Sequence, residues 1–102
     1  MKRVVVQYRV KPDQVARNEE LIRAVYEELD RTQPEDLHYA TLRLDDGVTF
    51  IHIADEPANG PSPLFALETF QRFRDGISDR CDQQPIAKEA REVGSFRMFA
   101  SA

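Results

Sequence analysis

The sequence predicts an α+β fold of the ferredoxin-like class, in the order β-α-β-β-α-β, with both helices on one face of an antiparallel sheet. Three observations carry this prediction. Residues 3–10 alternate in a run rich in β-branched side chains, residues 13–31 and 63–81 repeat apolar groups at helical spacing, and Asp46 and Gly47 separate two strand-like runs. A length of 102 residues suits one domain, so residues 1–102 are expected to form one.

The first strand and first helix follow from side-chain periodicity. One face of the predicted strand carries Val4, Val6, Tyr8 and Val10. In the helix predicted over residues 13–31, Pro12 stands at the start, where its missing N–H is not needed. Pro34 cannot continue a helix, so we expect this one to end before the segment TQPED.

The middle of the chain predicts a hairpin followed by an exposed loop. Residues 37–54, LHYATLRLDDGVTFIHIA, contain two strand-like runs around Asp46 and Gly47, and both of these residues tolerate the positive φ of a tight turn. The loop DEPANGPSP then ends on Ser62 and Pro63, which suit a helix cap and a first helical residue.

A second helix and a last strand complete the predicted order. The helix is expected over residues 63–81, with an apolar stripe at Ala66, Phe70, Phe73, Ile77 and Cys81. The last strand is expected in EVGSFRMF, residues 92–99. In that strand Phe96 and Met98 would share one face and Ser95 and Arg97 the other.

Composition disfavours several classes of protein. The net charge of −4 disfavours a nucleic-acid partner. The apolar run after the first residues is too short for a signal peptide, and no stretch approaches the roughly 20 apolar residues that span a bilayer. Cys81 is the single cysteine, so no intrachain disulfide can form and a reducing cytoplasm is the simplest compartment.

The alternation of the strands predicts which side chains each face of the sheet carries. The helices are expected to cover the more apolar set: Val4, Val6, Tyr8, Val10, Ala40, Leu42, Leu44, Ile51, Ile53, Phe96 and Met98. The open face would then carry Val5, Gln7, Arg9, Tyr39, Thr41, Arg43, Phe50, His52, Ser95 and Arg97. With Val5 and Phe50 at its middle, that face is too apolar to meet water, so we expect a second copy to pack against it and enclose a cavity.

The pattern VVVQYRVKPD with a helix, a hairpin, FIHIADE, a Pro-rich loop, a second helix and a final EVGSFRMF resembles the antibiotic biosynthesis monooxygenase group of the dimeric α+β barrel superfamily. The resemblance covers nearly the whole chain and lies in layout, not in a catalytic signature. It implies a homodimer whose sheets form a barrel with a pocket in each half. The group includes oxygenases that attack phenolic substrates without metal or flavin, haem-degrading enzymes, and small proteins with no known activity. The haem-degrading branch relies on an Asn, Trp and His set, and is disfavoured because this chain has no Trp.

His52 is the candidate catalytic residue, and the candidate substrate contacts are Gln7, Arg9, Tyr39, Thr41 and Phe50. His52 is expected to point away from the helices into a partly dry pocket, where it would be neutral at pH 7 and act as an acid or base. The alternative is a core histidine held by one hydrogen bond. Tyr39 would either pack at the dimer seam or donate a hydrogen bond to a ligand. His38 and His52 are not spaced as metal ligands, so no metal site is predicted.

Two function classes remain open from the sequence. In the first, the chain is a cofactor-independent monooxygenase that binds a small aromatic or polyketide-like molecule. In the second, it is a non-catalytic dimer that binds a small ligand or serves as an accessory subunit. A deep and mostly apolar cavity beside His52 would favour the first class, and a filled barrel would favour the second.

Overall fold

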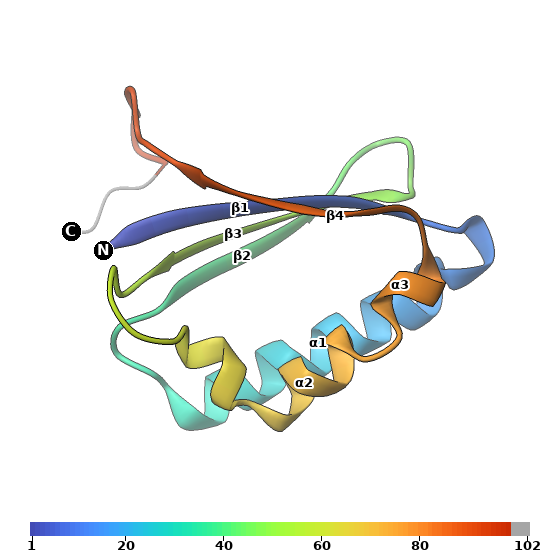
Figure 1. Ribbon diagram of the computed structural model, residues 1–102, viewed down its shortest axis with the longest axis horizontal. Coiled ribbons are helices and arrows are strands. Elements are labelled where there is room, and N and C mark those ends of the chain that lie inside the picture. Colours follow the sequence, from blue (N-terminus) through green and yellow to red (C-terminus); the bar gives the residue numbers. More distant parts are fainter. Residues whose placement is uncertain (99–102) are drawn as a thin grey trace.

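The computed structural model describes residues 1–98 and contains a four-stranded sheet with its helices on one face (Figure 1). The elements are β1 (Lys2–Val10), η1 (Pro12–Gln14), α1 (Val15–Thr32), β2 (His38–Arg43), β3 (Thr49–Glu56), η2 (Pro63–Ala66), α2 (Glu68–Arg74), α3 (Ile77–Arg80) and β4 (Cys81–Ala90). The strands lie in the order β2-β3-β1-β4, and each neighbouring pair is antiparallel. This is the ferredoxin-like α+β fold that the sequence predicts.

The first helix and the hairpin are close to their predicted positions. Pro12 opens the short 3₁₀ turn η1, which leads into α1. The hairpin connection spans residues 44–48, longer than the two-residue turn that Asp-Gly usually forms. Gly47 has a φ of 81°, and the Asp46 carboxylate accepts hydrogen bonds from the backbone N–H groups of Val48 and Thr49. The prediction that Asp46 and Gly47 form the hairpin turn is therefore confirmed, although the connection is longer than a two-residue turn.

The second predicted helix is broken into three short pieces. Leu67 is extended, with φ −84° and ψ 127°, and separates η2 from α2. Asp75 is also extended and Gly76 has a φ of 78°, so the chain turns before α3. Cys81 lies outside the helix and begins β4. Of the predicted apolar stripe, Phe73 and Cys81 are buried and Phe70 and Ile77 are half-buried, whereas Ala66 is exposed.

The last strand is β4, residues 81–90, and not the predicted segment 92–99. The sequence CDQQPIAKEA is a weak strand by propensity and contains Pro85. A proline is tolerated because β4 is an edge strand, where an N–H can be missing without breaking the sheet. Residues 92–98 form no strand, and Phe96 and Met98 are 77% and 76% exposed, so neither belongs to the core. Phe99 lies outside the described residues.

The prediction of the two sheet faces is right for β1 and wrong for β2 and β3. The register pairs Val6 with His52 and Tyr8 with Phe50, and directly paired residues project to the same side. We call the side covered by the helices the helix face and the opposite side the outer face. The helix face carries Tyr39, Thr41, Arg43, Phe50 and His52. The outer face carries Val5, Gln7, Ala40, Leu42, Ile51 and Ile53.

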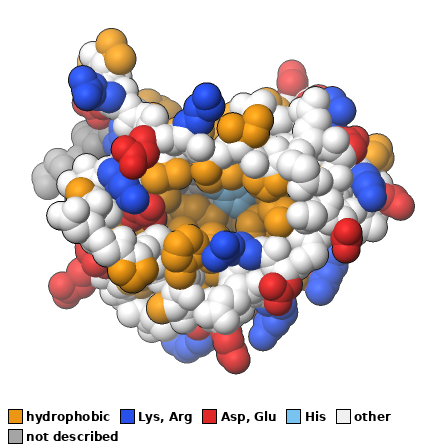
Figure 2. All heavy atoms as spheres, in the orientation of Figure 1, with side chains coloured by type: hydrophobic (Ala, Val, Ile, Leu, Met, Phe, Trp, Pro, Cys, Tyr) orange, Lys and Arg blue, Asp and Glu red, His pale blue; other side chains and the backbone are white. Residues whose placement is uncertain are grey.

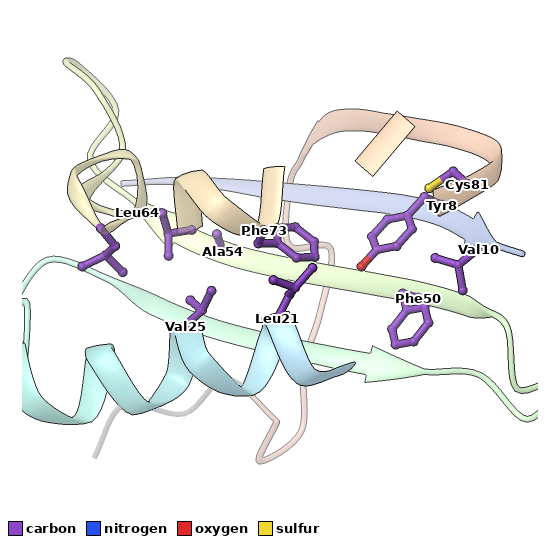
Figure 3. Packing of buried hydrophobic residues seen from close by; sticks show 10 residues of the cluster. Tyr8, Val10, Leu21, Val25, Phe50, Ala54, Leu64, Phe73 and Cys81 are labelled. Atoms are coloured by element: carbon purple, nitrogen blue, oxygen red, sulfur yellow. The ribbon is translucent and has the colours of Figure 1, made fainter. Parts of the chain in front are cut away.

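The core fills the space between the helix face and the helices. Figure 3 shows Tyr8 and Val10 from β1 facing Leu21 and Val25 from α1, with Phe73 from α2 between them. Tyr8 stacks on Phe50 at a ring-centroid distance of 5.6 Å. These residues are all buried, and the burial of apolar surface is the main favourable term in folding.

Candidate functional site

A cavity of about 360 Å³ lies between the helix face of the sheet and the segment 62–77. Its apolar wall includes Val4, Val6, Ala54, Leu64, Phe70 and Phe73. Figure 2 shows this hollow, lined by hydrophobic side chains, with a histidine at its base and a cationic side chain at its rim. Small-molecule pockets have volumes of about 300 to 1,000 Å³, so the cavity has room for a ligand of modest size.

A second hollow, of about 430 Å³, lies where β1 begins and β4 ends and is a weaker candidate. It is lined by residues 1–3 and 89–92 together with Asp55. Its charged groups already neutralise one another, since the Arg3 guanidinium lies 2.6 Å from the Asp55 carboxylate. It lacks the apolar wall that a small-molecule pocket usually has.

His52 lies at the base of the first cavity and is held at both ring nitrogens. Its Nε2 lies 2.7 Å from the Tyr8 hydroxyl, and its Nδ1 lies 2.6 Å from the Tyr39 hydroxyl and 3.2 Å from Thr41 Oγ1. The Phe73 ring packs 5.4 Å from the imidazole, and only 5% of the His52 surface is exposed. The imidazole is therefore fixed in orientation and shielded from bulk water.

Asn18 and Arg80 form a second layer behind Tyr8. The Arg80 guanidinium donates from Nε to Asn18 Oδ1 at 3.1 Å, and Asn18 Nδ2 donates to the Tyr8 hydroxyl at 3.0 Å. Arg80 also donates to the carbonyl oxygens of Phe73 and Asp75 at the end of α2. Asn18 is fully buried, and both ends of its amide are paired.

The order of donors favours one tautomer of His52. Arg80 can only donate, so it orients Asn18 with Nδ2 towards Tyr8. The Tyr8 hydroxyl accepts that bond and has its own proton left to donate to His52 Nε2. Nδ1 then carries the imidazole proton and donates it to Tyr39. The hydroxyl proton of Tyr39 is left for a ligand in the cavity, which Tyr39 lines.

Burial sets the protonation states of this cluster. It lowers the pKa of His52 to about 4, so the imidazole is neutral at pH 7. It also raises the pKa of the Tyr8 and Tyr39 phenols, so both hydroxyls keep their protons. The site therefore presents a neutral base and two phenolic donors, with no formal charge at its base.

Three of the predicted site residues come together here, because Tyr39 and Thr41 both contact His52. A third hydroxyl joins them, since the Tyr26 hydroxyl lies 2.8 Å from Thr41 Oγ1. Phe50 shares the helix face but packs under Tyr8 and does not line the cavity.

Gln7 and Arg9 do not reach the cluster. Both lie on the outer face, because their parity in β1 is opposite to that of Tyr8. Arg9 forms an ion pair with Asp82 at 2.8 Å. The expectation that His52 and Gln7 share a face is wrong, and so is the expectation that the pocket lies on the open side of the sheet. The pocket and His52 are both beneath the helices.

Sequence reasoning missed Tyr8, Asn18, Arg80 and Glu56 as members of this region. The strand pattern predicts only that Tyr8 packs beneath the helices. For Arg80, the only sequence feature is its position near the end of the predicted second helix. Glu56 lines the cavity and is only 8% exposed. Glu56 lies an even number of residues from His52 along β3, and this is the one sequence feature that indicates that the two residues share a face of the sheet.

Neither a metal cluster nor a membrane-spanning helix is found within residues 1–98. No group of three or more His, Cys, Asp or Glu side chains in this range is arranged to hold a metal ion. None of the helices there combines the length and apolar character needed to cross a bilayer.

Comparison with known proteins finds no matching family model and no matching curated protein. Solved structures do match. A crystal structure of antibiotic biosynthesis monooxygenase is 23% identical, with a TM-score of 0.72 over 92% of this chain and 100% of that one. A conserved protein from Methanosarcina mazei Go1 is 17% identical, with a TM-score of 0.70 over 89% of this chain and 91% of that one.

A variant of SnoaB, a cofactor-independent oxygenase from Streptomyces nogalater, is also similar. It is 13% identical, with a TM-score of 0.64 over 94% of this chain and 96% of that one. These identities are low, so the comparisons show that the chain has the fold of antibiotic biosynthesis monooxygenase structures. They carry no residue roles across.

Proposed function

We propose that this protein is a cofactor-independent monooxygenase that binds a small aromatic or polyketide-like molecule beneath α2, with His52 as its proton acceptor. The observation that carries the proposal is the apolar cavity ending on a neutral, fully oriented histidine. An apolar pocket with a few convergent polar groups and a perturbed titratable group is the usual form of an active site. A structural core histidine would not need an open cavity beside it.

The pKa of His52 restricts the substrate. A simple phenol has a pKa of about 10, and transfer of its proton to an imidazole of pKa about 4 would cost about 8 kcal/mol. The cost falls as the acidity of the substrate rises, so an acidic phenol or enol is favoured over a simple phenol. Polyketide-like molecules carry such groups. Because Nδ1 already carries the imidazole proton, His52 would accept the new proton at Nε2, through the Tyr8 hydroxyl, which also lines the cavity.

The electron balance points the same way. A reaction that uses neither metal nor flavin must take every electron for O₂ from the substrate. Oxidation of an activated methylene to a carbonyl satisfies this requirement, because the methylene loses two hydrogens, one oxygen atom enters as the carbonyl oxygen, and the other leaves as water. The protein's part is to bind the substrate, exclude water and accept a proton from the methylene, leaving an electron-rich carbanion or enolate for O₂.

The test is oxygen consumption with dithranol, a dihydroxyanthrone that contains an activated methylene. The native protein is expected to consume O₂ faster than a protein-free solution. His52→Ala and His52→Gln are expected to lower that excess rate by about 10² to 10⁴ fold. His38→Gln, on the exposed end of β2, is the matched control and should keep the rate.

Dithranol binding measured by fluorescence gives the second reading. Binding without any excess oxygen consumption would favour the alternative function, a non-catalytic small-ligand carrier. Absence of both binding and turnover for dithranol and other acidic phenols would contradict the proposed function.

We also propose that two copies pair through the outer face as a homodimer. Leu42 is 50% exposed and Ile86 is 61% exposed, and Ile51 and Ile53 lie between them on the same face. Gln7 lies between Ile51 and Ile86, and a group of exposed apolar side chains with polar residues around it is typical of an interaction site. The sequence-based prediction assigned this seam to Phe50 and Tyr39, which are instead on the helix face. We further propose that residues 1–102 form a single domain. We also propose that the protein works in a reducing cytoplasm.

A further inference from the structure

We propose that Glu56 is a recognition site for a cationic amine, so that the natural ligand of the cavity carries an ammonium group at the end opposite His52. The inference extends the proposed function, since it rests on that function only for the aromatic part of the ligand. Glu56 is placed by β3 on the helix face, and its side chain lines the same cavity as His52.

The burial of Glu56 is the main argument. Glu56 is only 8% exposed, yet no residue among 1–98 forms a hydrogen bond or an ion pair with its carboxylate. Lys2, which pairs with it across the strands, lies beyond salt-bridge distance. A buried carboxylate is costly unless it is paired. Among the described residues, every side-chain N or O atom that is sealed from solvent has a hydrogen-bond partner. The unbonded Glu56 oxygens therefore keep some accessible surface, and Glu56 lines the cavity.

The distance between the two polar ends fits a small molecule. His52 and Glu56 are four residues apart on one strand, which separates their Cα atoms by roughly 13 Å. Both residues line the cavity. The surface between them is provided by Ala54, Leu64 and Phe70, which are apolar. This geometry suits an aromatic ring with an oxygen at one end and an ammonium on a short chain at the other.

Arg74 is the competing charge at this cavity and would favour a carboxylate ligand instead. Its guanidinium lies 4.7 Å from the centre of the Phe65 ring, on the exposed surface of α2. An exposed arginine that stacks on an aromatic ring is already stabilised and remains hydrated, so it does not require a ligand. Glu56 is the more deeply buried of the two charges, and the structure therefore favours a cation.

The experiment compares four probes by isothermal titration calorimetry: para-ethylphenol, tyramine, phenethylamine and para-hydroxyphenylpropionate. Tyramine adds an ammonium to the first, phenethylamine lacks the hydroxyl, and the last carries a carboxylate. The native protein is expected to bind tyramine about 10 to 100 fold more tightly than para-ethylphenol. Glu56→Gln should remove that preference and leave the affinity for para-ethylphenol unchanged, whereas Arg74→Gln should leave the preference intact.

Equal affinity for tyramine and para-ethylphenol, or tightest binding of the carboxylate probe with loss in Arg74→Gln, would overturn the inference. Circular dichroism checks that Glu56→Gln is folded, and Glu56→Asp provides a variant that keeps the charge. The two proposals fail separately. A Glu56-dependent preference for tyramine over para-ethylphenol would support the amine site even if dithranol is not oxidised, and oxidation of dithranol would stand even if no amine preference is found.

Discussion

Acidification should destabilise this protein because His52 is buried in its neutral form, whereas the unfolded chain can take up a proton at this residue. The pKa of His52 is about 4 in the folded state and near 6.5 when the chain is unfolded. Between these values the unfolded state binds a proton that the folded state does not, so stability rises with pH in this window. The contribution is complete above about pH 6.5 and is lost as the pH falls to about 4. At 1.36 kcal/mol per pKa unit, the loss is about 3 kcal/mol.

Urea denaturation at pH 7, 6, 5 and 4.5, followed by circular dichroism, measures this loss. Other groups also respond to acid, because hydrogen bonds from Thr49 and Arg3 lower the pKa of the Asp46 and Asp55 carboxyls. Their contribution is lost mainly at lower pH, near and below the ordinary carboxyl pKa of about 4. The histidine effect is therefore obtained as the difference between the native protein and His52→Gln at each pH.

The free energy of unfolding of the native protein, relative to that of His52→Gln, should fall by up to about 1.4 kcal/mol for each unit by which the pH is lowered from 6.5 to 4. His38→Gln leaves the buried histidine in place and should reproduce the native pH dependence. A native protein and a His52→Gln variant with parallel pH profiles would refute the argument, because His52 would then titrate alike in the folded and unfolded states. An imidazole NMR titration of His52 with a midpoint above 6 would refute it independently.

Three further predictions concern the hydrogen-bond cluster and the outer face. Tyr8→Phe leaves the Asn18 amide buried with an unpaired donor and should lower the free energy of unfolding by about 1 to 3 kcal/mol in urea denaturation. Arg80→Met removes three hydrogen bonds, two of them to carbonyls at the end of α2, and should lower the thermal midpoint more than Tyr8→Phe does. Ile53→Asp introduces a charge on the outer face and should give a folded monomer of 11.8 kDa by light scattering, where the native protein is expected to give a dimer.

The controls use neighbouring positions. Phe50→Asp, on the helix face, should unfold the chain and not merely separate two copies, because Phe50 is 2% exposed in the core. A native monomer at micromolar concentration would contradict the dimer. Tyr8→Phe with unchanged stability would show that Asn18 finds another partner.

The sequence alone determined the order of elements because periodicity, proline positions and turn residues are local signals. The alternation of residues 3–10 predicted β1 and its helix face, the spacing in 13–31 predicted α1, and Asp46 with Gly47 predicted the hairpin. It failed at β4, since residues 81–90 are a poor strand by propensity and pair only because β1 offers a free edge.

Only the tertiary structure decided which face His52 occupies. The local pattern offers Ile51 and Ile53 as the apolar side of β3, and burying them with the helices is the reasonable choice from sequence. The fold instead buries His52, because Tyr8, Tyr39 and Thr41 from two other strands satisfy its ring nitrogens. The cost of burying a polar group depends on partners that are distant in sequence, and no local pattern contains that information.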